Sequence, residues 1–239
     1  MRRGTTLVIL PGLDGMGARI AEFARRLAPA VEARIAGYPR DQPLGYDGLE
    51  ALVRPALPQR ERFFLLAESF AGPLAIRISA DPPPGLAGVI LCGTFAENPF
   101  PWLRPLRAIA VRLPLRSMPR WLRAMLMWGS GDPRRAPPQA ARSMATVDRG
   151  VLRRRIAAIL DVDETHRLGR LTLPVLILAA RRDRIVPRAA TRRLAAALPK
   201  AQLAEIDGPH LLLQARPQEC AAAVARFIDS CGLSRAALE

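Results

Sequence analysis

Cysteine and histidine are both scarce in this chain of 239 residues, which has three of the first and two of the second. The cysteines, Cys92, Cys220 and Cys231, are odd in number and lack the short spacings of a zinc site or a disulfide framework. Sparse cysteine use is typical of a reducing compartment. We therefore expect a cytoplasmic protein that holds no metal.

Long apolar runs are also missing, and aromatic residues make up only 5% of the chain. The first apolar run, residues 5–10, is too short for the core of a secretory signal and is ended by Pro11 and Gly12. No uncharged stretch reaches the ~18 residues that a membrane span needs. With so few aromatics, the stacking platforms that bind single-stranded nucleic acid are scarce.

Lysine is nearly absent, whereas arginine is abundant. Lys200 is the one lysine among 36 basic residues, and 21 acidic residues leave a net charge of +15. Such a charge can attract nucleic acid, an anionic membrane or an acidic substrate, but a compositional bias toward arginine also produces it. Because the arginines are spread over many elements and no binding motif accompanies them, we expect no nucleic-acid partner.

The apolar and charged fractions, 50% and 24%, are those of a globular protein. Short apolar runs alternate with amphipathic stretches along the chain. Strands are predicted near residues 5–10, 30–36, 62–67, 86–92, 173–180 and 202–206, and helices near 17–28, 46–57, 71–80, 187–198 and 211–229. This alternation predicts an α/β fold with a mostly parallel sheet of about six strands, flanked by helices.

The alternation of strand and helix patterns stops between about residues 95 and 170, where no strand pattern occurs and proline, arginine and tryptophan are frequent. The segment resembles several short helices, and a helical insertion of this kind is a natural lid over a site. We therefore divide the chain into a core of residues 1–94 and 171–239 and a helical cap of residues 95–170. The apolar residues of the cap would pack it onto the core, line an acyl pocket or, with its arginines, associate weakly with an anionic membrane surface. They include Trp102, Leu103, Leu106, Ile109, Leu113, Trp121, Leu122, Leu126 and Trp128, among Arg104, Arg107, Arg112, Arg116, Arg120 and Arg123.

The strongest local signal surrounds Ser69, which follows an apolar strand and precedes a helix pattern. A serine on a sharp strand-to-helix turn exposes its hydroxyl at the edge of a sheet, and small residues two before and two after it avoid clashes. Ala67 and Ala71 stand at these two positions, where the usual pattern has glycine. Ser69 is therefore the candidate nucleophile, and an ordinary serine at a helix start is the alternative.

A nucleophilic serine needs a base and a carboxylate that orients it. His210 lies in a loop directly after the last predicted strand, whereas His166 lies in a polar run. Asp183 follows the strand before that one, so it also lies at a carboxyl end, where catalytic groups gather. Glu97 is a second candidate acid, and Asp207 is too near His210 in sequence to reach its ring.

The loop after the first strand holds Gly12, Gly15 and Gly17, which allow close backbone approach to a bound group. We predict that the backbone N–H groups of Leu13 and Phe70 form an oxyanion hole. The glycine spacing lacks the lysine of a phosphate-binding loop and differs from the dinucleotide fingerprint, so nucleotide binding is not expected.

The order serine, acid, histidine is that of α/β-hydrolases, and the chain resembles this superfamily over nearly its whole length. The loop at residues 10–15 and the motif at residues 68–72 resemble those of esterase- and lipase-like members. Plant phytyl-ester-synthase-type acyltransferases carry a similar first loop. Many members have a histidine where Pro11 stands. The resemblance implies catalytic roles for Ser69, Asp183 and His210, and hydrolysis that needs no metal or organic cofactor.

These features predict a serine hydrolase that cleaves a small to medium hydrophobic carboxylic ester through an acyl-enzyme. An acyltransferase or thioesterase with the same triad is the first alternative. A catalytically silent binding protein with a hydrolase-like fold is the second. The sequence leaves open the acyl and alcohol groups and the oligomeric state.

Overall fold

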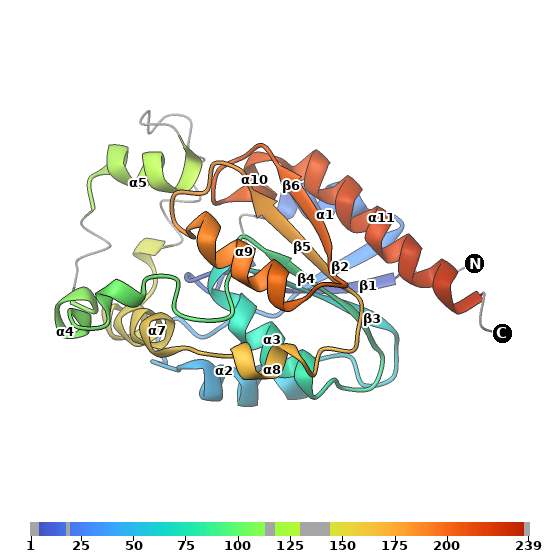
Figure 1. Ribbon diagram of the computed structural model, residues 1–239, viewed down its shortest axis with the longest axis horizontal. Helices are drawn as coiled ribbons and strands as arrows, with labels where there is room; N and C mark the ends of the chain where they lie inside the picture. Colours follow the sequence, from blue (N-terminus) through green and yellow to red (C-terminus); the bar gives the residue numbers. More distant parts are fainter. Residues whose placement is uncertain (1–4, 18–19, 113–117, 130–143, 237–239) are drawn as a thin grey trace.

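A parallel sheet forms the centre of the molecule (Figure 1). The computed structural model describes residues 5–17, 20–112, 118–129 and 144–236. The strands run in the order β2-β1-β3-β4-β5-β6, and every neighbouring pair is parallel. The strands are β1 (Thr5–Leu10), β2 (Val31–Ile35), β3 (Phe63–Glu68), β4 (Leu86–Cys92), β5 (Val175–Ala180) and β6 (Gln202–Ile206). The predicted fold class is therefore confirmed.

The central strands are apolar without alternation because helices cover both faces of the sheet. All residues of β3 and β5 are buried, whereas the edge strands β2 and β6 each expose several side chains. Two apolar clusters lie on opposite faces of the sheet. One face is covered by α2 (Tyr46–Val53), α3 (Gly72–Ala80), α8 (Thr165–Leu168) and α9 (Arg188–Ala197). The other is covered by α1 (Ala21–Leu27), α10 (Leu212–Ala215) and α11 (Pro217–Ala236) (Figure 1).

One predicted helix is wrong as a single element. The pattern at 211–229 forms two helices, α10 and α11, separated at Arg216. Arg216 has φ −135° and ψ 53°, outside the helical region, because the ring of Pro217 disfavours a helical conformation in the residue before it. The predicted helix at 46–57 also changes type, since a 3-10 turn, η2 (Arg54–Ala56), follows α2. Of the helix predicted near 17–28, residues 18–19 lie outside the described residues.

The predicted cap contains short helices and is anchored at both ends on the core. Its described elements are η4 (Pro101–Leu103), α4 (Arg107–Ala110), α5 (Arg120–Trp128), α7 (Arg149–Asp161) and α8. Phe95 at one end and Val162 and Leu168 at the other belong to an apolar cluster of the sheet. Leu113 and Arg116 lie outside the described residues. The division of the chain into core and cap stays a prediction.

The topology determines where a site can form. Because all strands are parallel, the loops that follow β1, β3, β4, β5 and β6 leave the sheet at one edge. The chain passes from β1 to β2 on one side and continues with β3 on the other side of β1. Ligands of open α/β sheets bind outside the carboxyl ends of the strands at such a switch point. The loop after β1 and the turn after β3 meet there.

The contact of α11 with the sheet gives a test of the fold. Phe227 is fully buried and meets Phe64 of β3 edge to face, with ring centroids 6.0 Å apart. Replacing Phe227 by alanine leaves a cavity, and we expect the free energy of unfolding to fall by about 3–5 kcal/mol. Urea unfolding followed by circular dichroism measures this change. Exposed Arg226→Ala is the neighbouring control, expected within about 0.5 kcal/mol of wild type, and equal midpoints for the two variants would contradict the packing.

Candidate active site

Ser69 lies on a strained turn directly after β3. Its φ of +53° is the one positive value among the non-glycine residues that the structure describes. A non-glycine residue there costs about 1–3 kcal/mol, and such outliers gather at functional sites. Ser69 opens a single 3-10 turn, η3 (Ser69–Ala71), and α3 follows with Ala71 as its N-cap. Ser69 is therefore not an ordinary helix cap.

The space around this turn is narrow. Ala67 and Ala71 are fully buried, which agrees with the small size expected at these positions. The tightest position is Gly72, where an added Cβ would lie 1.9 Å from Oγ1 of Thr94. Sequence reasoning did not assign a role to Gly72 or Thr94. The only signal was the glycine at the last position of the motif at residues 68–72.

The structure brings the three predicted triad residues together in a hydrogen-bonded chain. Oγ of Ser69 lies 2.9 Å from Nε2 of His210, and Nδ1 of His210 lies 2.8 Å from Oδ2 of Asp183. The side chains of His210 and Asp183 are 4% and 6% exposed. Since an ionised carboxylate only accepts hydrogen bonds, Nδ1 carries the ring proton, and Nε2 is left to accept the hydroxyl proton of Ser69.

Backbone contacts hold the acid and the histidine in place. The other oxygen of Asp183, Oδ1, accepts the N–H groups of Ile185 and Val186 at 2.7 and 2.8 Å, so Oδ2 remains for the ring. Gly93, after β4, has φ +53°, and a Cβ there would lie 3.6 Å from Oδ2 of Asp183. Few side chains tolerate that φ, so glycine is favoured where the two loops meet.

The alternative acids and the second histidine lie elsewhere. Glu97 pairs with Arg193, and Asp207 pairs with Arg182 at 2.9 Å. His166 is exposed on α8. Asp183 is thus the carboxylate that contacts His210 in the described part of the chain.

The glycine-rich loop after β1 lies against the turn of Ser69. A Cβ added to Gly12 would lie 3.8 Å from Cβ of Ser69, so the two backbones are in close approach. The carbonyl of Gly12 accepts the N–H of Gly15 at 2.9 Å, and Gly15 has φ +71°. This tight turn therefore lies close to Ser69, and the oxyanion role of the Leu13 N–H stays a prediction.

A buried arginine holds this loop from α7. Arg155 is fully buried, and its guanidinium donates to the carbonyl oxygens of Leu13 and Pro39, both at 2.8 Å. The guanidinium also lies over the ring of Tyr38, 5.5 Å from its centroid. Burial lowers the pKa of Arg155 from its ordinary value, and the neighbouring Tyr38 and Asp14 oppose that change. Sequence reasoning missed Arg155 because it is one arginine among many. The available signal was its position four residues after apolar Val151, on the same helix face.

Phe70 is held by two tyrosines. The hydroxyl of Tyr46 donates to the carbonyl of Phe70 at 2.9 Å, and the rings stack with centroids 5.0 Å apart. Tyr38 meets Phe70 edge to face at 6.4 Å. Burial raises the pKa of Tyr46 well above its ordinary value, so its hydroxyl stays neutral and can donate.

Cys92, at the end of β4, is a second potential nucleophile at this edge of the sheet. It is buried and unpaired by a disulfide, and burial raises the pKa of its thiol well above its ordinary value. The thiolate is the nucleophilic form of cysteine. Cys92 is therefore a core side chain at neutral pH, not a competitor of Ser69.

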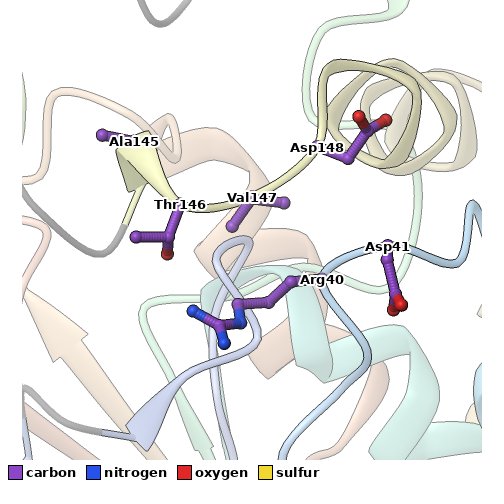
Figure 2. Close-up of a pocket in the computed structure, with 6 residues that line it drawn as sticks. All are labelled: Arg40, Asp41, Ala145, Thr146, Val147 and Asp148. Atoms are coloured by element: carbon purple, nitrogen blue, oxygen red, sulfur yellow. The ribbon is translucent and has the colours of Figure 1, made fainter.

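Besides Arg155, two further parts of the predicted cap lie near the site, α5 and the segment before α7. The N–H of Leu211, next to His210, donates to the carbonyl of Met127 in α5 at 3.2 Å. An open cleft of about 520 Å³ lies where the loop after β2 faces the segment before α7. Figure 2 shows its lining side chains, which are Arg40, Asp41, Ala145, Thr146, Val147 and Asp148. Buried Val147 belongs to a small apolar cluster against which Leu13 packs, so the cleft adjoins the glycine-rich loop.

Among the described residues, histidine, cysteine, aspartate and glutamate form no group of three or more that could hold a metal ion. No helix in the same part of the chain has the length and apolar character to span a bilayer.

Residues 47–212, more than half of the chain, match the family described as serine aminopeptidase, S33. The chain belongs to this family of α/β-hydrolases. The matched range includes Ser69, Asp183 and His210. No curated protein is significantly similar to the chain in sequence.

Solved structures share the fold over almost the whole chain. An enol-lactonase from Burkholderia xenovorans LB400 superposes with a TM-score of 0.80 at 18% identity, covering 95% of this chain and 92% of that one. A hydrolase from Pseudomonas aeruginosa PA01 gives 0.76 at 20% identity, with 95% and 91% covered. A bromoperoxidase from Bacillus anthracis gives 0.78 at 18%, with 95% and 92% covered. At such identities the likeness shows the fold and does not choose a substrate.

Proposed function

We propose that this hydrolase cleaves a carboxylic ester through an acyl-enzyme on Ser69. The observation that carries the proposal is the chain of hydrogen bonds from Ser69 through His210 to Asp183. Hydrogen bonds of 2.9 and 2.8 Å join the hydroxyl, the imidazole and the carboxylate, and this geometry supports proton transfer from Ser69 to His210. The strained backbone of Ser69 and the adjacent glycine-rich loop support the same chemistry.

The first half-reaction forms the acyl-enzyme. Nε2 of His210 takes the hydroxyl proton as Oγ of Ser69 attacks the carbonyl carbon. The N–H groups of Leu13 and Phe70 stabilise the tetrahedral oxyanion. His210 then donates its proton to the leaving alcohol, and the carbon–oxygen bond of the ester breaks.

The second half-reaction frees the enzyme. Water attacks the acyl carbonyl while His210 accepts one of its protons, and the carboxylic acid leaves as Oγ recovers a proton. Asp183 holds the imidazole in the required tautomer and stabilises its charged form. The chain's own residues account for each proton, so the proposed reaction needs no metal or organic cofactor.

The preference for a small to medium hydrophobic ester rests on α5. Ala124 is its one buried residue, and five of its apolar side chains are half-buried, while Trp121 is exposed. The carbonyl of Met127 in this helix accepts the N–H of Leu211, the residue after His210. The half-buried apolar side chains are Leu122, Met125, Leu126, Met127 and Trp128. A surface of this composition favours an acyl chain over a charged substrate.

Ser69→Ala tests the nucleophile. We expect loss of essentially all turnover of p-nitrophenyl butyrate, because no acyl-enzyme can form, and no covalent labelling by a fluorophosphonate. The melting temperature should stay at or above that of wild type, since alanine removes no packed atom beyond the hydroxyl. Turnover retained at the wild-type rate would show that Ser69 is not the nucleophile.

Products separate hydrolysis from acyl transfer. Wild-type enzyme, ester and an added alcohol or thiol acceptor are incubated together, and the products are identified by mass spectrometry. Free carboxylic acid as the dominant product supports hydrolysis, whereas transfer of most acyl groups to the acceptor would replace the proposal by acyl transfer on the same triad.

Asp183→Asn tests the acid. The amide keeps the shape of the carboxylate but favours the wrong imidazole tautomer, and we expect kcat to fall by about 10³–10⁴-fold. Glu97→Gln is the matched control, because Glu97 was the competing acid and pairs with Arg193 on the surface. Its kcat should stay within about twofold of wild type. A large loss in Glu97→Gln with little change in Asp183→Asn would reverse the assignment.

A further inference from the structure

The N–H of Phe70, one of the two expected oxyanion donors, belongs to the same peptide group as the carbonyl of Ser69. A peptide group is planar and trans, so its N–H and C=O point in opposite directions. Whatever holds the carbonyl of Ser69 therefore also aims the N–H of Phe70. The contacts of that carbonyl decide how rigidly the donor is held.

Two donors reach the carbonyl oxygen of Ser69. One is the N–H of Gly72, as the chain enters α3. The other is the hydroxyl of Thr94, which donates to it from the loop after β4. Thr94 is 3% exposed, and its branched side chain has few rotamers to choose from. The absence of a side chain at Gly72 provides the space for the hydroxyl of Thr94.

We propose that Thr94 is a positioning residue for the oxyanion hole, whose hydroxyl aims and polarises the peptide between Ser69 and Phe70. This inference rests on the proposed ester hydrolysis. A hydrogen bond to a carbonyl also strengthens the donor at the other end of the same peptide, since linked hydrogen bonds polarise one another. Thr94 thus acts on the reaction through the backbone and touches no substrate atom.

The carbonyl oxygen in the peptide of the second expected donor is held by a backbone contact. The N–H of Leu13 shares its peptide with the carbonyl of Gly12, which accepts the N–H of Gly15 at 2.9 Å. Both donor peptides therefore have their carbonyl oxygens occupied. Only the Thr94 contact uses a side chain, so it is the one that a substitution can remove.

Thr94→Ala, Thr94→Ser and the control Thr6→Ala are compared by steady-state kinetics and thermal unfolding. Thr6 is 2% exposed and lies at the start of β1, where its hydroxyl faces Glu61, away from the catalytic edge. We expect Thr94→Ala to lower kcat about tenfold with KM within about twofold, a fraction of the 100-fold or more that a lost oxyanion donor costs. Thr94→Ser keeps the hydroxyl and should restore most of the activity.

The inhibition constant of a trifluoromethyl ketone distinguishes a positioning role from a purely structural one, because a purely structural role of Thr94 would leave that constant unchanged. The ketone adds to Ser69 as a tetrahedral oxyanion, so its inhibition constant should rise in Thr94→Ala by the same factor as kcat/KM falls. Equal activity in Thr94→Ala and wild type, or an equal loss in Thr6→Ala, would overturn the positioning role. If wild type itself neither turns over esters nor reacts with a fluorophosphonate, the proposed function fails instead.

A second, independent observation concerns the exposed segment around α4. Trp102, Leu106 and Ile109 are 62%, 51% and 62% exposed, although large apolar side chains are ordinarily buried. Arg104 and Arg112 beside them are exposed, and Arg107 pairs with Asp161. We call Trp102, Leu106, Ile109, Arg104 and Arg112 the α4 face.

We propose that the α4 face docks on an anionic lipid surface. Tryptophan and isoleucine can enter the boundary between headgroups and acyl chains, while arginines bind the headgroups. A second copy of the chain is disfavoured as occupant, because pairing would bring together arginines of two molecules that each carry a net charge of +15.

Vesicle flotation tests the docking. Wild type should be retained by vesicles that contain phosphatidylglycerol at low salt, less at high salt, and not by phosphatidylcholine alone. The double variant Trp102→Ser/Ile109→Ser should lose most retention, whereas Leu203→Ser, at an apolar position on β6 that is 51% exposed, should not. Retention unchanged in the double variant overturns the proposal. If light scattering shows that wild type is a dimer and the double variant a monomer, the α4 face is a self-association surface. Binding to random DNA without binding to vesicles would assign the face to nucleic acid.

Discussion

The left-handed backbone of Ser69 is the constraint on which the rest of the site depends. A φ of +53° lets β3 end and the following helical turn begin within one residue, so the hydroxyl projects from the sheet edge toward His210. That turn is stable only where its neighbours are small and its polar groups are satisfied. Buried Ala67 and Ala71 and the bare Cα of Gly72 meet the first condition, and the hydroxyl of Thr94 meets the second.

Aromatic rings pack around the turn that carries Ser69 and Phe70. Phe70 lies between Tyr46 and Tyr38, and Tyr38 in turn lies beneath the guanidinium of Arg155. Each of these polar side chains except Tyr38 donates to a backbone carbonyl of the site. An oxyanion hole depends on donors that are aimed before the reaction begins, because reorganisation would cost free energy at the transition state. The buried rings restrict that reorganisation.

The strand-end positions of Ser69, Asp183 and His210 could be predicted because parallel topology alone brings such ends to one edge. The roles of the neighbouring residues Thr94 and Arg155 could not be predicted. Thr94 and Arg155 act through hydrogen bonds to carbonyls of distant segments, and nothing in the local pattern of either residue marks that contact. The break at Arg216 was missed because the amphipathic pattern continues across it, whereas the ring of Pro217 decides the local conformation.

Arg155 connects the predicted cap to the glycine-rich loop after β1. A buried guanidinium is costly unless its donors find partners, and two of them bond to the carbonyls of Leu13 and Pro39. Asp148 is the N-cap of the helix that carries Arg155: its carboxylate accepts N–H groups of the first turn, and its own N–H donates to the carbonyl of Arg40 at the open cleft. The cleft, the start of α7 and the glycine-rich loop after β1 are thus joined by contiguous contacts. A substrate group that entered the cleft would meet the same elements that hold the loop of Leu13, so recognition and oxyanion stabilisation would depend on one packed unit.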